Sequence, residues 1–369
     1  MDRREFALSV SALAVATLTS NAAAQSTGIS AAARSVWRRS IVLDCNIGPQ
    51  FSGETFPLPR ADLDIANASG LTALKTSIGG FNAPFEDTVA EIAYYQRALE
   101  VYPATFMQIR TVADFATAKR TGKLGIIFGF EGATCLEDKL DRIELFRNLG
   151  VRVMQLSYNL TSPFGAGVLA PADATLTDLG RQAVAKMNAV GVALDLSHAN
   201  PATTAAAMAA STKPVIMSHG GCVAIHPHPR NKSDDQLRAL AAKGGVFGIY
   251  DLPYLSASPH QPTLDDYMAH MTHALDVMGE DHVGFGSDTS FGTMDNSPES
   301  HAQFDEMERQ RHAAGVAAPE EDRMTYVEGL NRSDRSLVIA DALLKHGYPV
   351  RVAEKVLGAN FVRVFGEIW

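Results

Sequence analysis

The sequence predicts an α/β protein with the architecture of a TIM-type (β/α)₈ barrel carrying loop insertions. Eight short apolar runs alternate with helical patterns along the 369 residues. Each run is followed closely by a polar or titratable side chain, as at the functional rim of such barrels. A doubly wound sheet is the alternative fold, but the Gly-rich phosphate-binding turn that usually follows its first strand is absent.

Composition and charge narrow the class of protein. The chain is 46% hydrophobic and 20% charged, which is ordinary for a globular protein. Its net charge of −9 argues against nucleic acid as a partner, because phosphate binding needs a basic surface. The cysteines, Cys45, Cys135 and Cys222, are too few and too scattered for a disulfide framework or a zinc ribbon.

Residues 1–24 have the pattern of a twin-arginine signal peptide and are excluded from the fold. Arg3 and Arg4 precede Phe6, and the apolar run Ala7–Leu18 is followed by a small-residue cleavage pattern that ends at Ala24. We expect export to a bacterial periplasm, and a single barrel domain over residues 25–369. No later run reaches the ~18 apolar residues of a membrane helix, so we expect no membrane anchor.

The strand candidates are short apolar runs bounded by turn residues, as in buried parallel strands. They are Ser40–Cys45, Leu71–Ile78, Gly125–Phe130, Val151–Leu156, Val192–Leu196, Pro214–Met217, Gly244–Ile249 and His282–Gly286. The residues that follow them are Asn46, Ser77, Glu131, Tyr158, His198, His219, Tyr250 and Asp288.

Helical spacing of apolar residues, with caps and glycine stops, predicts the helices between these strands. The ranges are Asp87–Val101, Asp138–Leu149, Thr177–Val190, a segment opened by Asn200 and Pro201, Gln236–Ala242, Leu264–Met278, Arg335–Lys345 and Val350–Phe365. The polar stretch Ser290–Glu328 shows no apolar periodicity. We expect it to be a long irregular insertion over one face of the barrel.

Two consecutive predicted strands each end in Ser-His, and the predicted functional site is centred on them. His198 and His219 lie at the carboxyl ends of these strands, where parallel α/β folds bind ligands. Glu131 ends an earlier strand. Imidazole and carboxylate are ligands that zinc favours, so Glu131, His198 and His219 predict a three-ligand metal site. A single such histidine is more often structural, and Glu131 alone fits a helix cap equally well.

Asp288, after the eighth strand, is the natural general base beside such a metal. Arg230 presents a fork that matches a carboxylate, so Arg230 with Asn231 predicts a substrate-binding pair. A surface ion pair of Arg230 with a nearby aspartate remains open. His226 and His228 are expected to shape the loop. No Gly-x-Ser-x-Gly nucleophile elbow is present, which disfavours an acyl-serine hydrolase.

The chain resembles the membrane (renal or microsomal) dipeptidase family of zinc metallopeptidases. The matching stretches are FGFEGA, LTDLGRQAVAKMNAVGVALDLSHAN, PVIMSHGGCVAIHPHPRN, DDQLRALAAKGGVFGI, HVGFGSD and LGANFVRVF. The resemblance implies a barrel of the metal-dependent hydrolase kind with a binuclear zinc centre. It implies Glu131 as the bridging ligand, His198 and His219 as ligands of one zinc, Arg230 as the carboxylate anchor and Asp288 as the catalytic aspartate.

Two positions depart from the family pattern. The first strand of the family ends in Asp-Gly-His-x-Asp, whose His and final Asp bind the other zinc; here Asn46 and Gly48 stand there. Asn46 and Cys45 are left as weak additional ligands, so we expect one tightly bound zinc and leave a second open. The histidine that the family aims at the reacting carbonyl is Tyr158 here, which can still donate a hydrogen bond to an oxyanion.

The sequence therefore predicts a metal-dependent hydrolase that cleaves an amide bond of a dipeptide or similar carboxylate-bearing small molecule, with Asp288 and Tyr158 as catalytic residues. Two alternatives stay open: a family member that tailors or matures another metabolite, and a non-catalytic binding protein with half of its metal centre lost. A homodimer is also left open.

Overall fold

A computed structural model describes residues 28–48, 56–80 and 82–369. The proposed signal peptide lies outside these residues. The strands are β1 (Leu43–Asp44), β2 (Ala73–Ser77), β3 (Phe106–Gln108), β4 (Leu124–Phe130), β5 (Val151–Met154), β6 (Ala193–Leu194), β7 (Ile216–Gly220), β8 (Val246–Ile249) and β9 (Val283–Phe285).

Parallel pairing arranges eight of these strands into a ring. One sheet runs β1-β2-β4-β5-β6 and another runs β7-β8-β9. A bridge from Asp195 to Ile216 joins β6 to β7, and the backbone N–H of Cys45 donates to the Phe285 carbonyl at 3.1 Å, which joins β9 to β1. The predicted barrel is confirmed. The short β3, which pairs with the start of β4, was not predicted.

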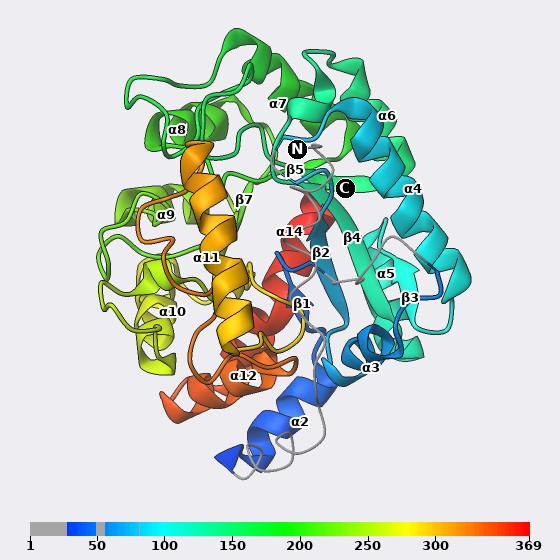
Figure 1. Ribbon diagram of the computed structural model, residues 1–369, viewed down its shortest axis with the longest axis vertical. Helices are drawn as coiled ribbons and strands as arrows, with labels where there is room; N and C mark the ends of the chain where they lie inside the picture. Colours follow the sequence, from blue (N-terminus) through cyan, green and yellow to red (C-terminus); the bar gives the residue numbers. More distant parts are fainter. Residues whose placement is uncertain (1–27, 49–55, 81) are drawn as a thin grey trace.

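Helices surround the strands (Figure 1). They are α2 (Ala31–Arg39), α3 (Arg60–Ala68), α4 (Phe85–Val101), α5 (Val112–Thr121), η2 (Thr134–Leu136), α6 (Asp141–Leu149), α7 (Asp178–Val190), α8 (Pro201–Ala210), α9 (Asp234–Ala242), η3 (Pro253–Leu255), α10 (Leu264–Met278), α11 (Pro298–Ala313), α12 (Arg335–Lys345), α13 (Val350–Glu354), η4 (Lys355–Ala359) and α14 (Asn360–Ile368). Among the described residues, no helix combines the length and apolar character that crossing a membrane requires.

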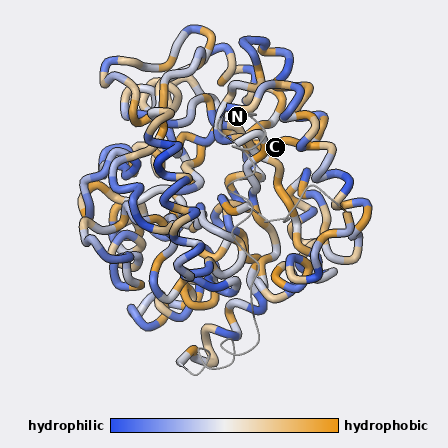
Figure 2. The backbone as a smooth tube through the Cα atoms, in the orientation of Figure 1, coloured by the Kyte–Doolittle hydropathy of each residue, from blue (hydrophilic) through white to orange (hydrophobic). Residues whose placement is uncertain are grey.

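The strands carry the hydrophobic core, as the tube coloured by hydropathy shows (Figure 2). All seven residues of β4 are buried. The barrel interior holds a cluster that includes Leu43, Cys45, Ala73, Ile127 and Val153. Inside and outside positions alternate along a strand, so Glu131 follows Ile127 and Gly129 on the inner side of β4.

The prediction that Ser290–Glu328 is irregular was wrong, because this stretch contains the 16-residue helix α11. Ser297 caps the helix by accepting from the backbone N–H of Ser300, and Pro298 occupies its first turn. The helix buries only a few side chains, Phe304 and Glu308 among them, so it has no wide apolar stripe. Its cap, rather than its periodicity, was the usable signal.

The predicted helix Val350–Phe365 is also interrupted, because α13, the π-helical turn η4 and α14 follow one another. Gly358 lies in the π-turn, where a Cβ atom would come within 2.7 Å of the Ile41 carbonyl oxygen. The absence of a side chain therefore lets this segment pack directly against the chain entering β1.

Candidate active site

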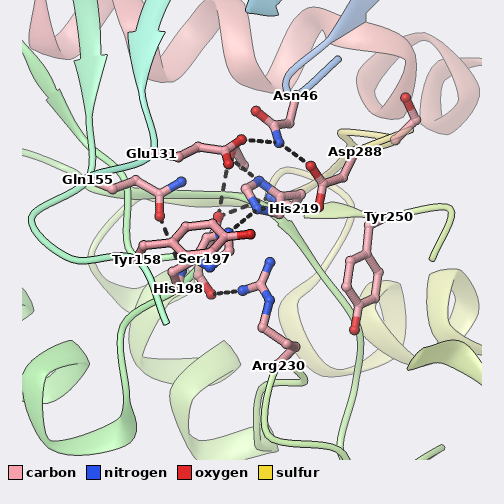
Figure 3. Close-up of polar contacts among 12 residues, drawn as sticks. Asn46, Glu131, Gln155, Tyr158, Ser197, His198, His219, Arg230, Tyr250 and Asp288 are labelled. Carbon is pink, nitrogen blue, oxygen red and sulfur yellow. Dashed lines mark hydrogen bonds and ion pairs between the residues drawn. The ribbon is translucent and has the colours of Figure 1, made fainter. Parts of the chain in front are cut away.

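The carboxyl ends of the barrel strands bring together most of the side chains singled out from the sequence (Figure 3). Glu131 follows β4, His198 follows β6, Asp288 follows β9, and His219 lies within β7 rather than after it. Ligand atoms of Glu131, His219 and Asp288 lie within 4.8 Å of one another. His198 joins them through His219, since the two Nε2 atoms are 3.1 Å apart. Asp288, predicted to act as the general base beside the metal, lies next to these candidate ligand atoms.

Hydrogen bonds fix the tautomers of both imidazoles. Nδ1 of His198 donates to Oδ1 of Asn159 at 2.7 Å. Nδ1 of His219 donates to Oγ of Ser218 at 2.8 Å, because the Ser218 proton is given to Asp195 at 2.5 Å. Burial, followed by the charge of a nearby arginine, lowers the pKa of both histidines well below the ordinary value. Both imidazoles are therefore neutral, and their Nε2 lone pairs face each other.

This arrangement fits a divalent metal. Two facing lone pairs repel each other unless a cation lies between them. A tetrahedral zinc with Zn–N bonds of about 2.0–2.1 Å separates two nitrogens by about 3.3 Å, and the His198–His219 separation is 3.1 Å. The Glu131 carboxylate completes a donor set of the kind that borderline metals bind, and the Asp288 carboxylate lies beside it.

Asp195 lies beneath the two histidines in a layer of buried polar side chains. Its carboxylate accepts from Oγ of Ser197 at 2.6 Å, from Oγ of Ser218 at 2.5 Å and from Nε2 of Gln155 at 3.1 Å. The backbone N–H groups of both serines also donate to it. Such partners orient metal-binding imidazoles. The sequence prediction missed Asp195, although an acidic residue inside an apolar run is a usable signal.

Asn46 links the two carboxylates of the cluster. Its Nδ2 donates to Oε1 of Glu131 at 2.7 Å and to Oδ1 of Asp288 at 2.6 Å. Its Oδ1 accepts from Nζ of Lys75 at 2.5 Å. Lys75, on β2, is fully buried, and its Nζ lies 3.9 Å from Oε1 of Glu131. The sequence prediction missed Lys75, although a lysine within an apolar strand run is unusual.

Cys45 takes no part in this cluster, which corrects its prediction as an additional ligand. Its side chain packs in the barrel interior with Ala73 and Ile127. Burial raises the pKa of the thiol well above its ordinary value, so Cys45 is a protonated core residue rather than a thiolate ligand.

Asp288 combines a strained backbone with a perturbed carboxyl group. Its φ of 54° lies in the left-handed region that non-glycine residues rarely adopt, and its N–H donates to the Asn46 carbonyl at 2.6 Å. Burial and then the Glu131 carboxylate raise the pKa of Asp288 to about 8, against the lowering effect of Arg230 and Lys75. The group can therefore exchange a proton near neutral pH.

Arg230 is buried beside this cluster with part of its guanidinium unused. Nη1 donates to the Ser197 carbonyl at 2.7 Å, and Nη2 has no hydrogen-bond partner within the described chain. The surface ion pair considered for Arg230 does not form, because its side chain is only 2% exposed.

Asn231 is a structural residue, contrary to its prediction as a substrate contact. Its Nδ2 donates to the carbonyls of His226 and Tyr254, and its Oδ1 accepts from the Tyr250 hydroxyl at 2.5 Å. These three bonds fold the loop that carries Arg230, and they leave neither amide hydrogen for a substrate.

Tyr158 faces the cluster with its ring stacked on His198, the ring centroids being 4.1 Å apart. Burial raises the pKa of the Tyr158 hydroxyl to about 12, so it remains a donor. Arg311 of α11 places Nη2 3.4 Å from this hydroxyl and 2.6 Å from Glu321. Sequence reasoning missed Arg311 because it lies in the stretch read as irregular.

The loop histidines His226 and His228 hold the inserted stretch Ser290–Glu328 in place. Nε2 of His226 lies 2.8 Å from Oε2 of Glu320, and Nε2 of His228 donates to the Pro319 carbonyl at 2.7 Å. They shape the mouth of the barrel, in agreement with their predicted role.

Comparison with known proteins agrees with this geometry. Residues 59–307 match the model of the membrane dipeptidase family, peptidase family M19. Dipeptidase tcpJ of Claviceps purpurea is 28% identical over 78% of this chain, and dipeptidase verJ of Clonostachys rogersoniana is 32% identical over 76%. The chain spans 61% and 65% of the length of these two fungal relatives.

Solved structures share the fold. An amidohydrolase from Pseudomonas aeruginosa is 30% identical with a TM-score of 0.78, over 91% of this chain and 99% of that one. A metallopeptidase from Rhodobacter sphaeroides, liganded with a phosphinate mimic of the dipeptide L-Ala-D-Ala, is 21% identical with a TM-score of 0.71, over 89% of this chain and 100% of that one. The chain belongs to the membrane dipeptidase family.

Proposed function

We propose that the protein is a metal-dependent hydrolase that cleaves the amide bond of a dipeptide or of a similar small substrate with a free carboxylate. One observation carries the proposal. Nη2 of buried Arg230, which has no hydrogen-bond partner among the described residues, lies at the same barrel mouth as Asp288 and the facing imidazoles of His198 and His219. A carboxylate anchor beside a metal-binding and proton-accepting cluster suits hydrolysis of an amide that carries a carboxylate.

We propose one zinc ion, held by His198, His219 and Glu131. When bound there, a divalent metal acidifies water toward neutral pH and polarises a carbonyl group. The donor set supports zinc over magnesium or calcium, because two of the donors are imidazole nitrogens. The amide of Asn46 and the absence of a side chain at Gly48 support one ion rather than two.

The side chains of the mouth have separable roles in this proposal. Arg230 fixes the carboxylate of the substrate, which places the neighbouring amide over the cluster. Asp288 takes the proton from the attacking water and returns it to the leaving amine, as its pKa near neutrality allows. The Tyr158 hydroxyl donates to the oxygen that gains negative charge, with Arg311 beside it.

The test is a panel of dipeptides, N-acyl amino acids and their C-terminal amides, assayed with zinc-loaded protein and with Arg230→Met. We expect hydrolysis of dipeptides, and a 10- to 100-fold rise in KM for free carboxylates in the variant, since such a contact is worth roughly 1.5–3 kcal/mol. The amides should be affected little. Equal effects on both would show that Arg230 is structural.

Two other outcomes correspond to the alternative functions. Hydrolysis of N-acyl amino acids but not of dipeptides would favour a tailoring or maturation enzyme. Binding of the panel without any turnover, measured by calorimetry, would favour a non-catalytic binding protein.

We further propose that the protein is exported to the periplasm by the twin-arginine route. The support is the pattern Arg3-Arg4-Glu5-Phe6 followed by the apolar run Ala7–Leu18.

A further inference from the structure

A buried ammonium occupies one side of the carboxylate pair. Nζ of Lys75 lies 2.5 Å from Oδ1 of Asn46 and 3.9 Å from Oε1 of Glu131. The imidazoles come from elsewhere in the barrel, His219 from β7 and His198 from the loop after β6. The carboxylates of Glu131 and Asp288 therefore have two kinds of neighbour: the neutral imidazoles on one side and the Lys75 ammonium on the other.

The orientation of Asn46 follows from these neighbours. A lysine ammonium only donates, so the atom of Asn46 that faces Lys75 is its oxygen. The amide nitrogen then donates both of its hydrogens, one to Glu131 at 2.7 Å and one to Asp288 at 2.6 Å. Asn46 thus offers no lone pair toward the carboxylates, and its oxygen lone pair is directed at Lys75.

The backbone of β4 is built to admit this lysine. A Cβ atom at Gly129 would lie 2.6 Å from Cε and 3.3 Å from Cγ of Lys75. The aliphatic stem of Lys75 therefore lies flat against β4 where Gly129 has no side chain, and the head reaches Asn46. The side chain is 0% exposed, so its position is set by packing and not by solvent.

We propose that Lys75, held by Asn46, is a built-in cation that compensates Glu131 and Asp288 and closes that side of the cluster to a second metal ion. Lys75 is a positioning residue, since it acts on the carboxylates through Asn46 and through its charge 3.9 Å from Glu131. The inference deepens the proposed metal site and rests on that site.

Charge supports the assignment. Glu131 and Asp288 are two acidic groups joined through the amide of Asn46, and the Lys75 ammonium is 3.9 Å from the first of them. A second dication in the same place would meet an ammonium at close range, with neither an imidazole nor a carboxylate offered by residues 46 and 48.

The experiment restores ligands with and without the lysine. One variant carries Asn46→His and Gly48→Asp; the other adds Lys75→Met, which keeps an unbranched side chain as far as Cε and removes the charged nitrogen. Position 48 has room among the described residues, because none of their atoms lies within 4 Å of a Cβ built there. Zinc per chain is measured by elemental analysis after desalting, and by calorimetric titration.

We expect one zinc per chain in the parent and in the variant that keeps Lys75, and two in the variant that lacks it. Two tightly bound ions in the variant that keeps Lys75 would overturn the proposal, as would one ion in both. Cobalt loading gives a second count through its absorption spectrum.

Stability of the metal-free protein provides an independent measurement. Lys75→Met alone should raise the unfolding equilibrium constant at least tenfold, and added zinc should recover more of the loss than it adds to the parent. Gly129→Ala, which keeps the charge but displaces the Lys75 head, should act in the same direction. Parent-like stability in both variants would contradict the proposal. If Lys75→Met is soluble only with zinc present, the proposal is supported.

None of these measurements uses a substrate. Failure of the hydrolase proposal in the dipeptide panel therefore leaves the metal counts interpretable, and failure of the Lys75 proposal leaves the panel result intact.

Discussion

Asp288 has a strained backbone and a carboxyl group with a raised pKa, and it is the proposed site of proton exchange. It has a left-handed backbone, accepts from Asn46 and lies 3.8 Å from Nε2 of His219. An aspartate at this place is costly for stability, because its ionised form is partly buried beside another carboxylate. Such a cost is typical of residues retained for chemistry.

Asp288→Asn should lower kcat at least 100-fold, since general-base catalysis typically contributes 10²–10⁴. The amide keeps the shape and can still accept from Asn46, so the metal content should stay that of the parent. The melting temperature should be unchanged or higher, because repulsion with Glu131 is removed. Turnover at the parent rate, measured on any substrate that the panel identifies, would exclude Asp288 as the base.

Tyr158 tests whether a phenol can serve where the family resemblance implies a histidine. Tyr158→Phe should lower kcat about 100-fold with little change in KM, as removal of an oxyanion donor does. The ring that stacks on His198 remains, so metal content is the readout for unintended damage. Tyr348→Phe, far from the mouth, is the matched control. A change confined to KM would indicate that the hydroxyl binds the ground state and the transition state equally and gives no oxyanion stabilisation of its own.

At the level of single elements, α10 buries a histidine that ties two loops together. His270 accepts from the Cys222 N–H at Nδ1 and donates from Nε2 to the Leu255 carbonyl. Burial lowers the pKa of His270 to about 4. Protonation would remove the lone pair that Cys222 requires, so the fold holds the neutral form.

Stability should therefore depend on pH through His270. Its contribution is complete above about pH 6.5, the unfolded pKa, and is lost as the pH falls toward the folded value of about 4. The loss amounts to about 3 kcal/mol over that window. Urea titrations between pH 4 and 7 should show a shallower acid dependence for His270→Gln, whereas exposed His301→Gln should follow the parent. Identical curves for all three proteins would contradict the assignment.

Strands and helices differed in how well sequence predicted them. The eight barrel strands were recognisable because burial on both faces makes each a mainly apolar run bounded by turn residues. The helices α2, α3, α5 and α11 were missed, since three of them are only nine or ten residues long and α11 lacks an apolar stripe. Strand β3 has three residues, too few to show a pattern.

The residues of the candidate site also differ in how well the sequence predicted them. Glu131, His198, His219 and Asp288 were predictable because strand ends of a barrel converge. Lys75 and Arg311 were not predictable from strand ends. Lys75 starts inside strand β2 and Arg311 starts in the inserted helix α11, and each reaches the site through its long side chain. Which way an amide such as Asn231 or Asn46 turns depends on neighbours distant in sequence.

For the whole molecule, the export proposal has a direct test. Replacing Arg3 and Arg4 together with lysine should leave the full-length precursor in the cytoplasmic fraction, whereas replacing Arg38 and Arg39 in the same way should not. The measurement is immunoblotting of fractionated cells, with the mass of the mature form checking cleavage after Ala24. Periplasmic accumulation of the Arg3/Arg4 variant would exclude the twin-arginine route.

The rate at which each of the three buried thiols reacts with a labelling reagent reports how often its region of the protein opens. Cys45 follows β1, Cys135 lies in η2 and Cys222 follows β7. Burial raises the pKa of each thiol. A thiol reagent attacks the thiolate, so each cysteine reacts only when its own region opens. We expect labelling at least 100-fold slower than in urea. Zinc should slow Cys45 and Cys222 and leave Cys135 unchanged, as resolved by mass spectrometry of peptides. Equal slowing at all three would mean that opening is global, and that the metal holds the whole barrel and not only its mouth.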